Sequence, residues 1–154
     1  MSSLPLAGLG RYSDFGLLLA RVIVGVVLFA HGYQKLFDVG VANFGDAFLA
    51  PLGVPLPGLA AWIVALVEFV GGLALILGLL SRVVALLATI DLVVEILLVT
   101  LPVGLIAPIG GGPGAELNLA LIAGLLVILL VGPGRYSVDA GLTGGDPGVR
   151  VRPG

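Results

Sequence analysis

Long apolar runs separated by short polar breaks dominate the chain and determine the fold we expect. Four runs meet or approach the ~20 mostly apolar residues that a helix needs to cross a bilayer. They are residues 15–37, 59–80, 83–101 and 115–132. The fourth run is short, so it can span only if it stands near the membrane normal. This pattern predicts an all-α, integral membrane four-helix transmembrane bundle.

The composition indicates that the bilayer, rather than water, is the solvent for most of the chain. Of 154 residues, 59% are hydrophobic and 10% are charged, and the mean hydropathy is +1.24. Soluble domains carry about 25% charged residues, and a globule of this size buries only ~70% of its unfolded surface. The net charge of −2 gives no reason to expect a nucleic-acid partner.

The basic residues predict the orientation and the domain boundaries. With both ends in the cytoplasm, six arginines lie inside and only Lys35 lies outside, so the positive-inside rule predicts an N-in/C-in topology. We expect a cytoplasmic segment at 1–14, the transmembrane domain at 15–139 and a disordered cytoplasmic tail at 140–154. In the first outer connection, Asn43 is the predicted N-cap of a short helix that ends near Pro51.

Polar and ionisable residues interrupt the apolar runs at similar depths. At a rise of ~1.5 Å per residue, they fall in the central and outer levels of the bundle. A lipid-facing charge at the centre of a helix costs at least ~2.5 kcal/mol, so these side chains should point inward, toward one another. The predicted ligand- or proton-binding pocket comprises His31, Gln34, Lys35, Glu68, Asp91, Glu95, Glu116 and Asn118.

The charge balance of this pocket favours a functional site. Asp91 and Glu95 lie one helical turn apart on one face, and two such carboxylates cannot both stay ionised cheaply at low dielectric. Either one keeps a proton at neutral pH, or a cation or a ligand donor fills the gap. The first option suits proton exchange with a quinone headgroup, and the second suits a metal or ion held by His31, Glu68 and Glu95.

Two basic residues leave alternatives open. Lys35 lies near the outer boundary, where its side chain can reach the headgroups or pair with Glu116. Arg21 lies about 9 Å from the start of its predicted helix, within reach of the inner headgroups.

Several classes of chemistry are excluded by the residues that the chain lacks. With no cysteine, it forms no disulfide and no Cys-ligated metal site, and its single histidine rules out a bis-His haem held by this chain alone. The run of glycines at 110–114 lacks the flanking strand and lysine of a phosphate-binding loop. No nucleophile motif or cofactor fingerprint is present, so we expect no covalent cofactor and no catalysis by this chain alone.

Three segments, in order and spacing, resemble the DoxX family of small four-helix bacterial membrane proteins. They are "RVIVGVVLFAHGYQKLF", "VEFVGGLALILGLLSR" and "AELNLALIAGLLVILLVGPGRYSVD". The resemblance covers about residues 17–139, and "GPGRYSVD" and the "HG..K" element are its most specific parts. The residues that match positions typical of the family are His31, Lys35, Glu68, Arg82, Glu116, Arg135 and Asp139. The chain departs from the family pattern at Glu95, where a small residue is common, and at Thr100, where a histidine is common.

The resemblance implies a multi-pass protein of the bacterial plasma membrane that works with other membrane subunits. Family members are associated with quinone-linked thiosulfate oxidation or terminal oxidases in archaea, with oxidative-stress enzymes in mycobacteria, and with metal-handling gene clusters. We therefore expect an accessory subunit of a redox complex, with quinone as a candidate ligand. Two alternatives remain open: an ion, metal or small-solute binding or transport protein, and a structural assembly factor whose polar cluster only fixes helix register.

Overall fold

A computed structural model describes residues 7–144 of the chain. Within this range every regular element is helical and no strand occurs, which confirms the predicted all-α class. The first three long helices are α1 (Ser13–Tyr33), α3 (Pro57–Leu77) and α4 (Ser81–Glu95). A 3-10 turn, η1 (Ala7–Tyr12), precedes α1. Two π-helical segments, η2 (Gln34–Asp38) and η5 (Ile96–Thr100), extend α1 and α4.

Three helical runs are long and apolar enough to cross a membrane: Gly8–Asp38, Pro57–Leu77 and Ser81–Thr100. The fourth apolar helix, α5 (Glu116–Val131), has 16 residues. At ~1.5 Å per residue it is about 24 Å long, which is shorter than the ~30 Å hydrocarbon core of a typical bilayer. The fourth span and the N-in/C-in orientation therefore remain predictions.

The connection between α1 and α3 is helical over most of its length. It comprises α2 (Val41–Asn43), η3 (Phe44–Leu49) and η4 (Ala50–Leu52), and η3 is π-helical. The predicted N-cap at Asn43 was wrong, because Asn43 has a helical φ of −64° and lies inside the run. The run instead starts after Gly40, whose φ of +81° suits a residue without a Cβ.

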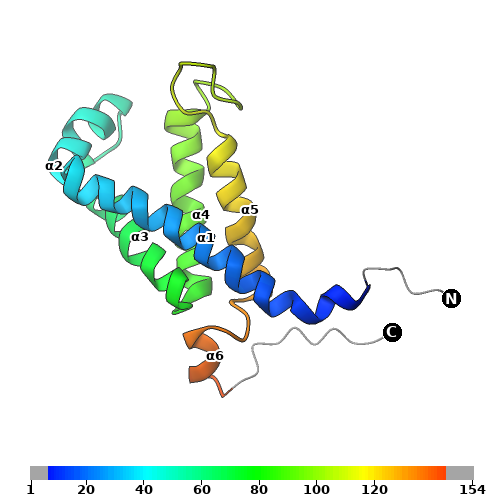
Figure 1. Cartoon of the computed structure of the whole chain (residues 1–154). Helices are drawn as coiled ribbons and strands as arrows, with labels where there is room; N and C mark the ends of the chain where they lie inside the picture. Colours follow the sequence, from blue (N-terminus) through cyan, green and yellow to red (C-terminus); the bar gives the residue numbers. More distant parts are fainter. Residues whose placement is uncertain (1–6, 145–154) are drawn as a thin grey trace.

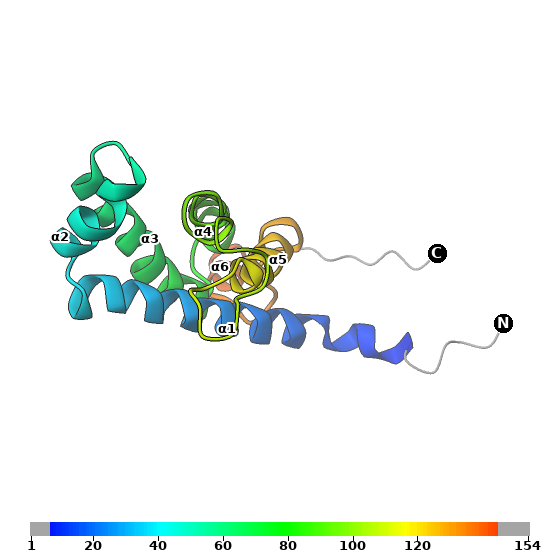
Figure 2. The same ribbon diagram turned by 90° about the horizontal axis from the view of Figure 1, so that it is seen from above.

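Helix α1 lies along one side of α3, α4 and α5 (Figures 1 and 2). It packs most closely on α3, and α4 packs along α5. The contact between α1 and α3 depends on two glycines. A Cβ on Gly25 would lie 2.8 Å from the carbonyl oxygen of Gly72, and a Cβ on Gly72 would lie 2.7 Å from the carbonyl oxygen of Gly25. Such close approach is typical of helix pairs in membranes, where no hydrophobic effect drives the association.

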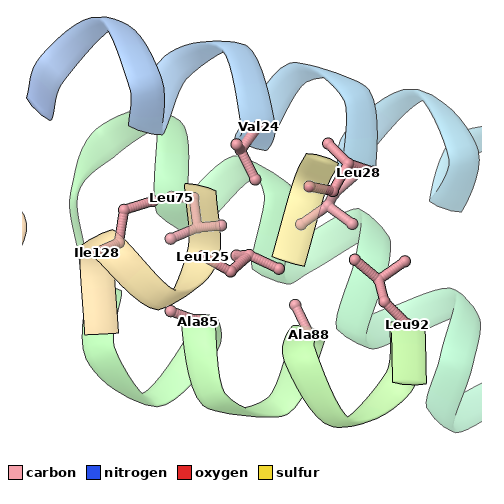
Figure 3. Packing of buried hydrophobic residues seen from close by; sticks show 9 residues of the cluster. Val24, Leu28, Leu75, Ala85, Ala88, Leu92, Leu125 and Ile128 are labelled. Atoms are coloured by element: carbon pink, nitrogen blue, oxygen red, sulfur yellow. The ribbon is translucent and has the colours of Figure 1, made fainter. Parts of the chain in front are cut away.

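The core lies where the four long helices face one another (Figure 3). Each helix contributes residues to a single apolar cluster, made of Val24, Leu28, Leu75, Ala85, Ala88, Leu92, Leu121, Leu125 and Ile128. Many other large apolar side chains on the same helices are exposed, as expected for surfaces that face lipid rather than water.

The chain remains ordered after α5. A short helix, α6 (Val138–Leu142), begins at Ser137, whose hydroxyl oxygen accepts a hydrogen bond from the Ala140 backbone N–H at 3.1 Å. The tail predicted to be disordered over 140–154 therefore starts inside a capped helix, and the ordered region reaches at least Leu142. Residues 145–154 lie outside the described residues.

Candidate functional site

An ion pair joins α3 to the C-terminal extension of α1. The Lys35 Nζ on η2 lies 2.6 Å from the Glu68 Oε2, and the two side chains are 14% and 2% exposed. The Lys35 ammonium also lies 5.5 Å from the centroid of the Phe44 ring. Lys35 therefore pairs with Glu68 rather than with Glu116 or the headgroups. Without this partner, a carboxylate buried in the middle of a membrane helix would be costly.

Beside this pair, four helices each direct one polar side chain to a small cavity. His31 comes from α1, Glu68 from α3, Glu95 from α4 and Asn118 from α5. The cavity volume is about 10 Å³, and leucines complete its walls. Asn118 is 5% exposed, and its Nδ2 has no hydrogen-bond partner among the described residues. Polar residues that are distant in sequence are thus brought together in the middle of the bundle.

A second, larger cavity of about 360 Å³ lies on the other side of this group, between α3, α4 and the α2–η4 connection. Its polar lining consists of Lys35, Asp91 and Glu95. The rest of the lining is apolar and includes Phe44, Phe48, Leu52, Val64 and Leu98. The cavity therefore has one ionisable end and an otherwise hydrocarbon-like wall.

All three π-helical segments line this larger cavity. Lys35 belongs to η2, Phe44 and Phe48 belong to η3, and Leu98 and Val99 belong to η5. A π turn is rare, because its wider winding is less favourable than an α turn, and it occurs frequently at functional sites. The departure from α-helical winding is thus concentrated where the bundle opens into a cavity.

Glu95 and the Lys35–Glu68 pair separate the two cavities. Glu95 lines both of them, whereas Lys35 lines the larger one and Glu68 lines the smaller one. The Asp91 Oδ2 is buried and has no hydrogen-bond partner among the described residues. We call His31, Lys35, Glu68, Asp91, Glu95 and Asn118 the mid-bundle cluster. Spare hydrogen-bonding groups beside a cavity are what the binding of a polar headgroup or the transfer of protons requires.

Two of the expected pocket residues lie elsewhere. Gln34 is exposed and lines neither cavity. Glu116 is also exposed, and its Oε1 accepts a hydrogen bond from the Ala107 backbone N–H at 3.0 Å, which holds the loop before α5. Within residues 7–144, no set of three or more His, Asp or Glu side chains is arranged to hold a metal ion. The geometry therefore does not assemble His31, Glu68 and Glu95 as metal ligands.

A second buried polar group lies at the opposite end of the bundle. Arg21 is 1% exposed, and its Nη2 donates a hydrogen bond to the Tyr136 carbonyl oxygen at 2.7 Å. The Asp139 carboxylate accepts hydrogen bonds from the backbone N–H groups of Leu80 at 2.7 Å and Ser81 at 2.8 Å. We call these five residues the C-terminal clamp. Arg21 is thus buried against the protein instead of reaching the headgroups.

The family resemblance included Tyr136 and Asp139 of this clamp, but the sequence did not predict their contacts. "GPGRYSVD" is one of the most specific parts of the family resemblance, and its neighbours also fasten the chain. The Arg135 backbone N–H donates to the Asp14 Oδ1 at 3.0 Å, and the Arg82 Nη2 donates to the Val131 carbonyl oxygen at 3.3 Å. These contacts hold the segment after α5 against the starts of α1 and α4.

Comparison with known proteins identifies the family. Residues 16–101, more than half of the chain, match the DoxX family. The chain belongs to the DoxX family. The match confirms the resemblance and covers α1 to α4, including the Lys35–Glu68 pair and both acids of α4. No solved structure matches this DoxX protein.

Curated relatives of this DoxX protein come from bacteria, and most of them are named as membrane proteins. It is 33% identical over 130 residues to "Uncharacterized membrane protein Rv3486" of Mycobacterium tuberculosis, covering 80% of this chain and 78% of the relative. It is 30% identical over 128 residues to "Putative oxidoreductase CatD" of Bacillus subtilis, covering 82% and 86%. It is also 30% identical over 133 residues to "Inner membrane protein YqjF" of Escherichia coli, covering 84% and 93%. Together with its three membrane-capable helices, this similarity makes it a multi-pass protein of the bacterial inner membrane.

Proposed function

We propose that this DoxX protein is a subunit of a membrane redox complex and that it binds a quinone in the larger cavity. The observation that carries the proposal is an apolar cavity of ligand size with ionisable side chains at one end only. Its volume of about 360 Å³ lies within the ~300–1,000 Å³ range of small-molecule sites. A quinone has the matching shape, because its two carbonyl oxygens lie on an otherwise apolar ring that carries an apolar tail.

The polar end of the cavity supplies the hydrogen bonds that such a ring needs. The Lys35 ammonium has three N–H donors, and its contact with the Glu68 Oε2 uses only one of them. A protonated Asp91 or Glu95 donates one more hydrogen bond to a quinone oxygen. Reduction of a quinone to a quinol consumes two electrons and two protons, and the two acids are placed to give protons to the oxygens.

The apolar walls suit a ligand that arrives through the bilayer. Phe44 and Phe48 have ring centroids 6.0 Å apart, a separation at which aromatic rings attract each other, and both line the cavity. Phe48 is 54% exposed and Leu52 is 41% exposed, so the lining continues to the outer surface of the helices. In a membrane this surface faces lipid. A hydrophobic quinone therefore enters without crossing water.

In this proposal the electrons come from another protein. The chain has no cysteine and one histidine, and residues 7–144 hold no arrangement of side chains for a metal ion. A relative from Bacillus subtilis carries the name "Putative oxidoreductase CatD", which supports a redox setting. We propose that companion membrane subunits carry the redox centre and that this chain supplies the quinone cavity and proton donors.

A pair of matched substitutions on α3 tests the quinone cavity. Val64→Phe fills the cavity, whereas Val70→Phe places the same side chain at a position that is 54% exposed and faces away from it. With protein in nanodiscs and decylubiquinone as the probe, we expect Val64→Phe to raise the Kd at least about tenfold, the equivalent of ~1.4 kcal/mol. Val70→Phe should bind as the wild type does.

Two outcomes would overturn the proposal. One is equal decylubiquinone binding by the wild type and Val64→Phe, and the other is purification from native membranes of a monomer with neither quinone nor a companion protein. A third result would favour a structural assembly factor instead. In that case Asp91→Asn and Glu95→Gln would lower the thermal stability and leave quinone retention unchanged.

A further inference from the structure

We propose that the small cavity holds one water molecule that passes protons between Glu95 and His31. The inference rests on the proposed function in one respect, which is that the quinone is the ligand that uses the protons. The water site itself depends only on the helix bundle. The cavity volume of about 10 Å³ is close to the ~10–15 Å³ that one water needs by this measure, and a buried water also needs two to four polar partners. His31, Glu68, Glu95 and Asn118 all line the cavity.

Asn118 is the residue that points most directly to a bound water. It is 5% exposed, and its Nδ2 has no hydrogen-bond partner in the described part of the chain. A buried N–H group without a partner loses its hydration and gains nothing in return. A water in the cavity would accept this hydrogen bond and a second one from protonated Glu95, and it would keep its own two O–H groups for His31 and Glu68.

Among the acids around the small cavity, Glu95 is the one that can exchange a proton. From α1 and η2, the facing groups are His31 and Lys35. From α3 the group is Glu68, whose Oε2 already binds the Lys35 ammonium at 2.6 Å. From α4 they are Asp91 and Glu95, and α5 contributes only the neutral Asn118. Glu68 therefore stays paired, whereas Glu95 has no ion-pair partner among the described residues.

The position of Glu95 connects the two cavities. It lines the larger cavity together with Asp91 and Lys35, and it lines the small cavity together with His31 and Asn118. A proton that binds to Glu95 from the larger cavity is therefore already next to the proposed water site. His31 is half-buried and also lines the small cavity, so its imidazole is the second group that the proposed water contacts.

The transfer is balanced without any electron or co-reactant. Protonated Glu95 gives its proton to the water as the same water gives one of its protons to the neutral imidazole of His31. The O–H bond of the carboxylic acid breaks, an N–H bond forms on the ring, and the water is unchanged. The products are a carboxylate and an imidazolium, and the reverse order of events takes a proton from His31 to Glu95.

The first measurement asks whether the water is present in the unmodified protein. The chain has two asparagines, Asn43 and Asn118, so labelling with ¹⁵N-asparagine gives two side-chain amides. In nanodiscs, we expect the Asn118 amide protons to show an NMR cross-peak to a long-lived water. Asn43 is exposed and serves as the internal control, and it should show exchange with bulk water only. A cross-peak absent at Asn118 would overturn the proposal.

The second measurement asks whether this water carries protons. Infrared spectroscopy follows hydrogen–deuterium exchange of the Glu95 carboxylic acid, whose band is identified by its loss in Glu95→Gln. Asn118→Leu keeps the approximate side-chain size and removes the hydrogen bonds. We expect it to slow the exchange about tenfold, as for the loss of one ordinary hydrogen bond. Thr100→Val is the matched control, because Thr100 is equally buried and lacks a hydrogen-bond partner but lines neither cavity.

The outcomes separate this inference from the proposed function. Equal exchange rates in the wild type and Asn118→Leu, or equal slowing in Thr100→Val, would overturn the water-mediated transfer. Decylubiquinone binding is measured on the same samples. If the wild type binds no decylubiquinone but Asn118→Leu still slows the exchange, the proposed function fails and the proton transfer stands. If the wild type binds decylubiquinone and Asn118→Leu does not slow the exchange, the proposed function stands and the proton transfer fails.

Discussion

The C-terminal clamp and the mid-bundle cluster each contain a fully buried charged side chain, Arg21 or Glu68, but the partners of the charged residues differ. In the clamp, Arg21 and Asp139 bind backbone groups of Tyr136, Leu80 and Ser81. Each of these contacts joins segments that are far apart in the sequence. The backbone groups involved lie at helix ends or in a loop, where no helical partner is available to them. The charged residues of the clamp thus stabilise the fold.

In the mid-bundle cluster the charged side chains bind one another and leave groups unused. Lys35 pairs with Glu68, while the Asp91 Oδ2 and the Asn118 Nδ2 have no partner among the described residues. Two cavities adjoin this cluster. A buried charge in a membrane helix is therefore not by itself a sign of function. Unused hydrogen-bonding groups and an adjacent cavity occur in both places, because the Arg21 Nε and Nη1 and the Ser81 Oγ also lack partners among the described residues, and Ser81 and Asp139 line a third cavity. The candidate site differs in that its charged side chains bind one another and line a cavity whose other walls are apolar.

The largest expected effect removes the centre of the clamp. Arg21→Ala deletes the hydrogen bond to Tyr136 and leaves space beside Gly78. We therefore expect a loss of about 3 kcal/mol in the free energy of unfolding, the upper end of the range for a hydrogen bond made by a charged group. Thermal unfolding in detergent measures it, with Arg11→Ala at an exposed position as the control. The decylubiquinone Kd of the folded fraction should not change. A changed Kd with unchanged stability would reverse the roles assigned to the two clusters.

A smaller loss of stability is expected when the ion pair of the mid-bundle cluster is broken. Glu68→Gln leaves Lys35 with a neutral partner and should cost about 2 kcal/mol, the range for hydrogen bonds to charged groups. It should also weaken decylubiquinone binding, because Lys35 then loses its fixed position at the cavity. The two properties can be separated in a second variant.

The double variant Lys35→Met with Glu68→Met separates stability from binding. Replacement of a whole buried ion pair by apolar residues of similar size is often neutral or stabilising, so unfolding should return to the wild-type value or above. Decylubiquinone binding should remain weak, since the cavity has lost its ammonium. Recovery of both properties would mean that the pair has only a structural role.

The cap provided by Asp139 is expected to have a more modest effect. Asp139→Asn keeps a hydrogen-bonding oxygen for Leu80 or Ser81 but loses the negative charge at the N-terminus of α4. We expect a cost of about 1 kcal/mol, typical of weakened helix caps. Asp46→Asn, at an exposed position of η3, is the control. Thermal unfolding of the two variants in the same detergent provides the comparison, and equal melting temperatures would contradict a capping role.

The sequence predicted where the helices lie because a membrane helix is specified by the length of its apolar run. It could not predict the partner of Lys35. That partner depends on how far α1 and α3 are rotated about their axes, and this rotation follows from the close contact of Gly25 with Gly72. The depth of Glu68 was readable from its position in the run, whereas the direction of its side chain was not.

The cavities were also beyond sequence reasoning, for a local reason. The π turns at η2, η3 and η5 change the winding by one residue and redirect the side chains that follow. No composition signal marks such turns in these apolar segments. The role of Arg21 was missed because an arginine near a helix end usually has access to headgroups. Its position here is decided by the segment after α5, which returns to cover it.

The smallest expected effect concerns Glu116, which matches a family position but lies outside both clusters. Its carboxylate accepts a hydrogen bond from the Ala107 backbone N–H and is exposed, so Glu116→Gln should change stability by no more than about 0.5 kcal/mol. Decylubiquinone binding should be unaffected. Glu95→Gln makes the same chemical change at the wall between the cavities and should weaken binding measurably. If Glu116→Gln and Glu95→Gln have the same effect on decylubiquinone binding, proximity to the cavities does not explain a functional role of Glu95.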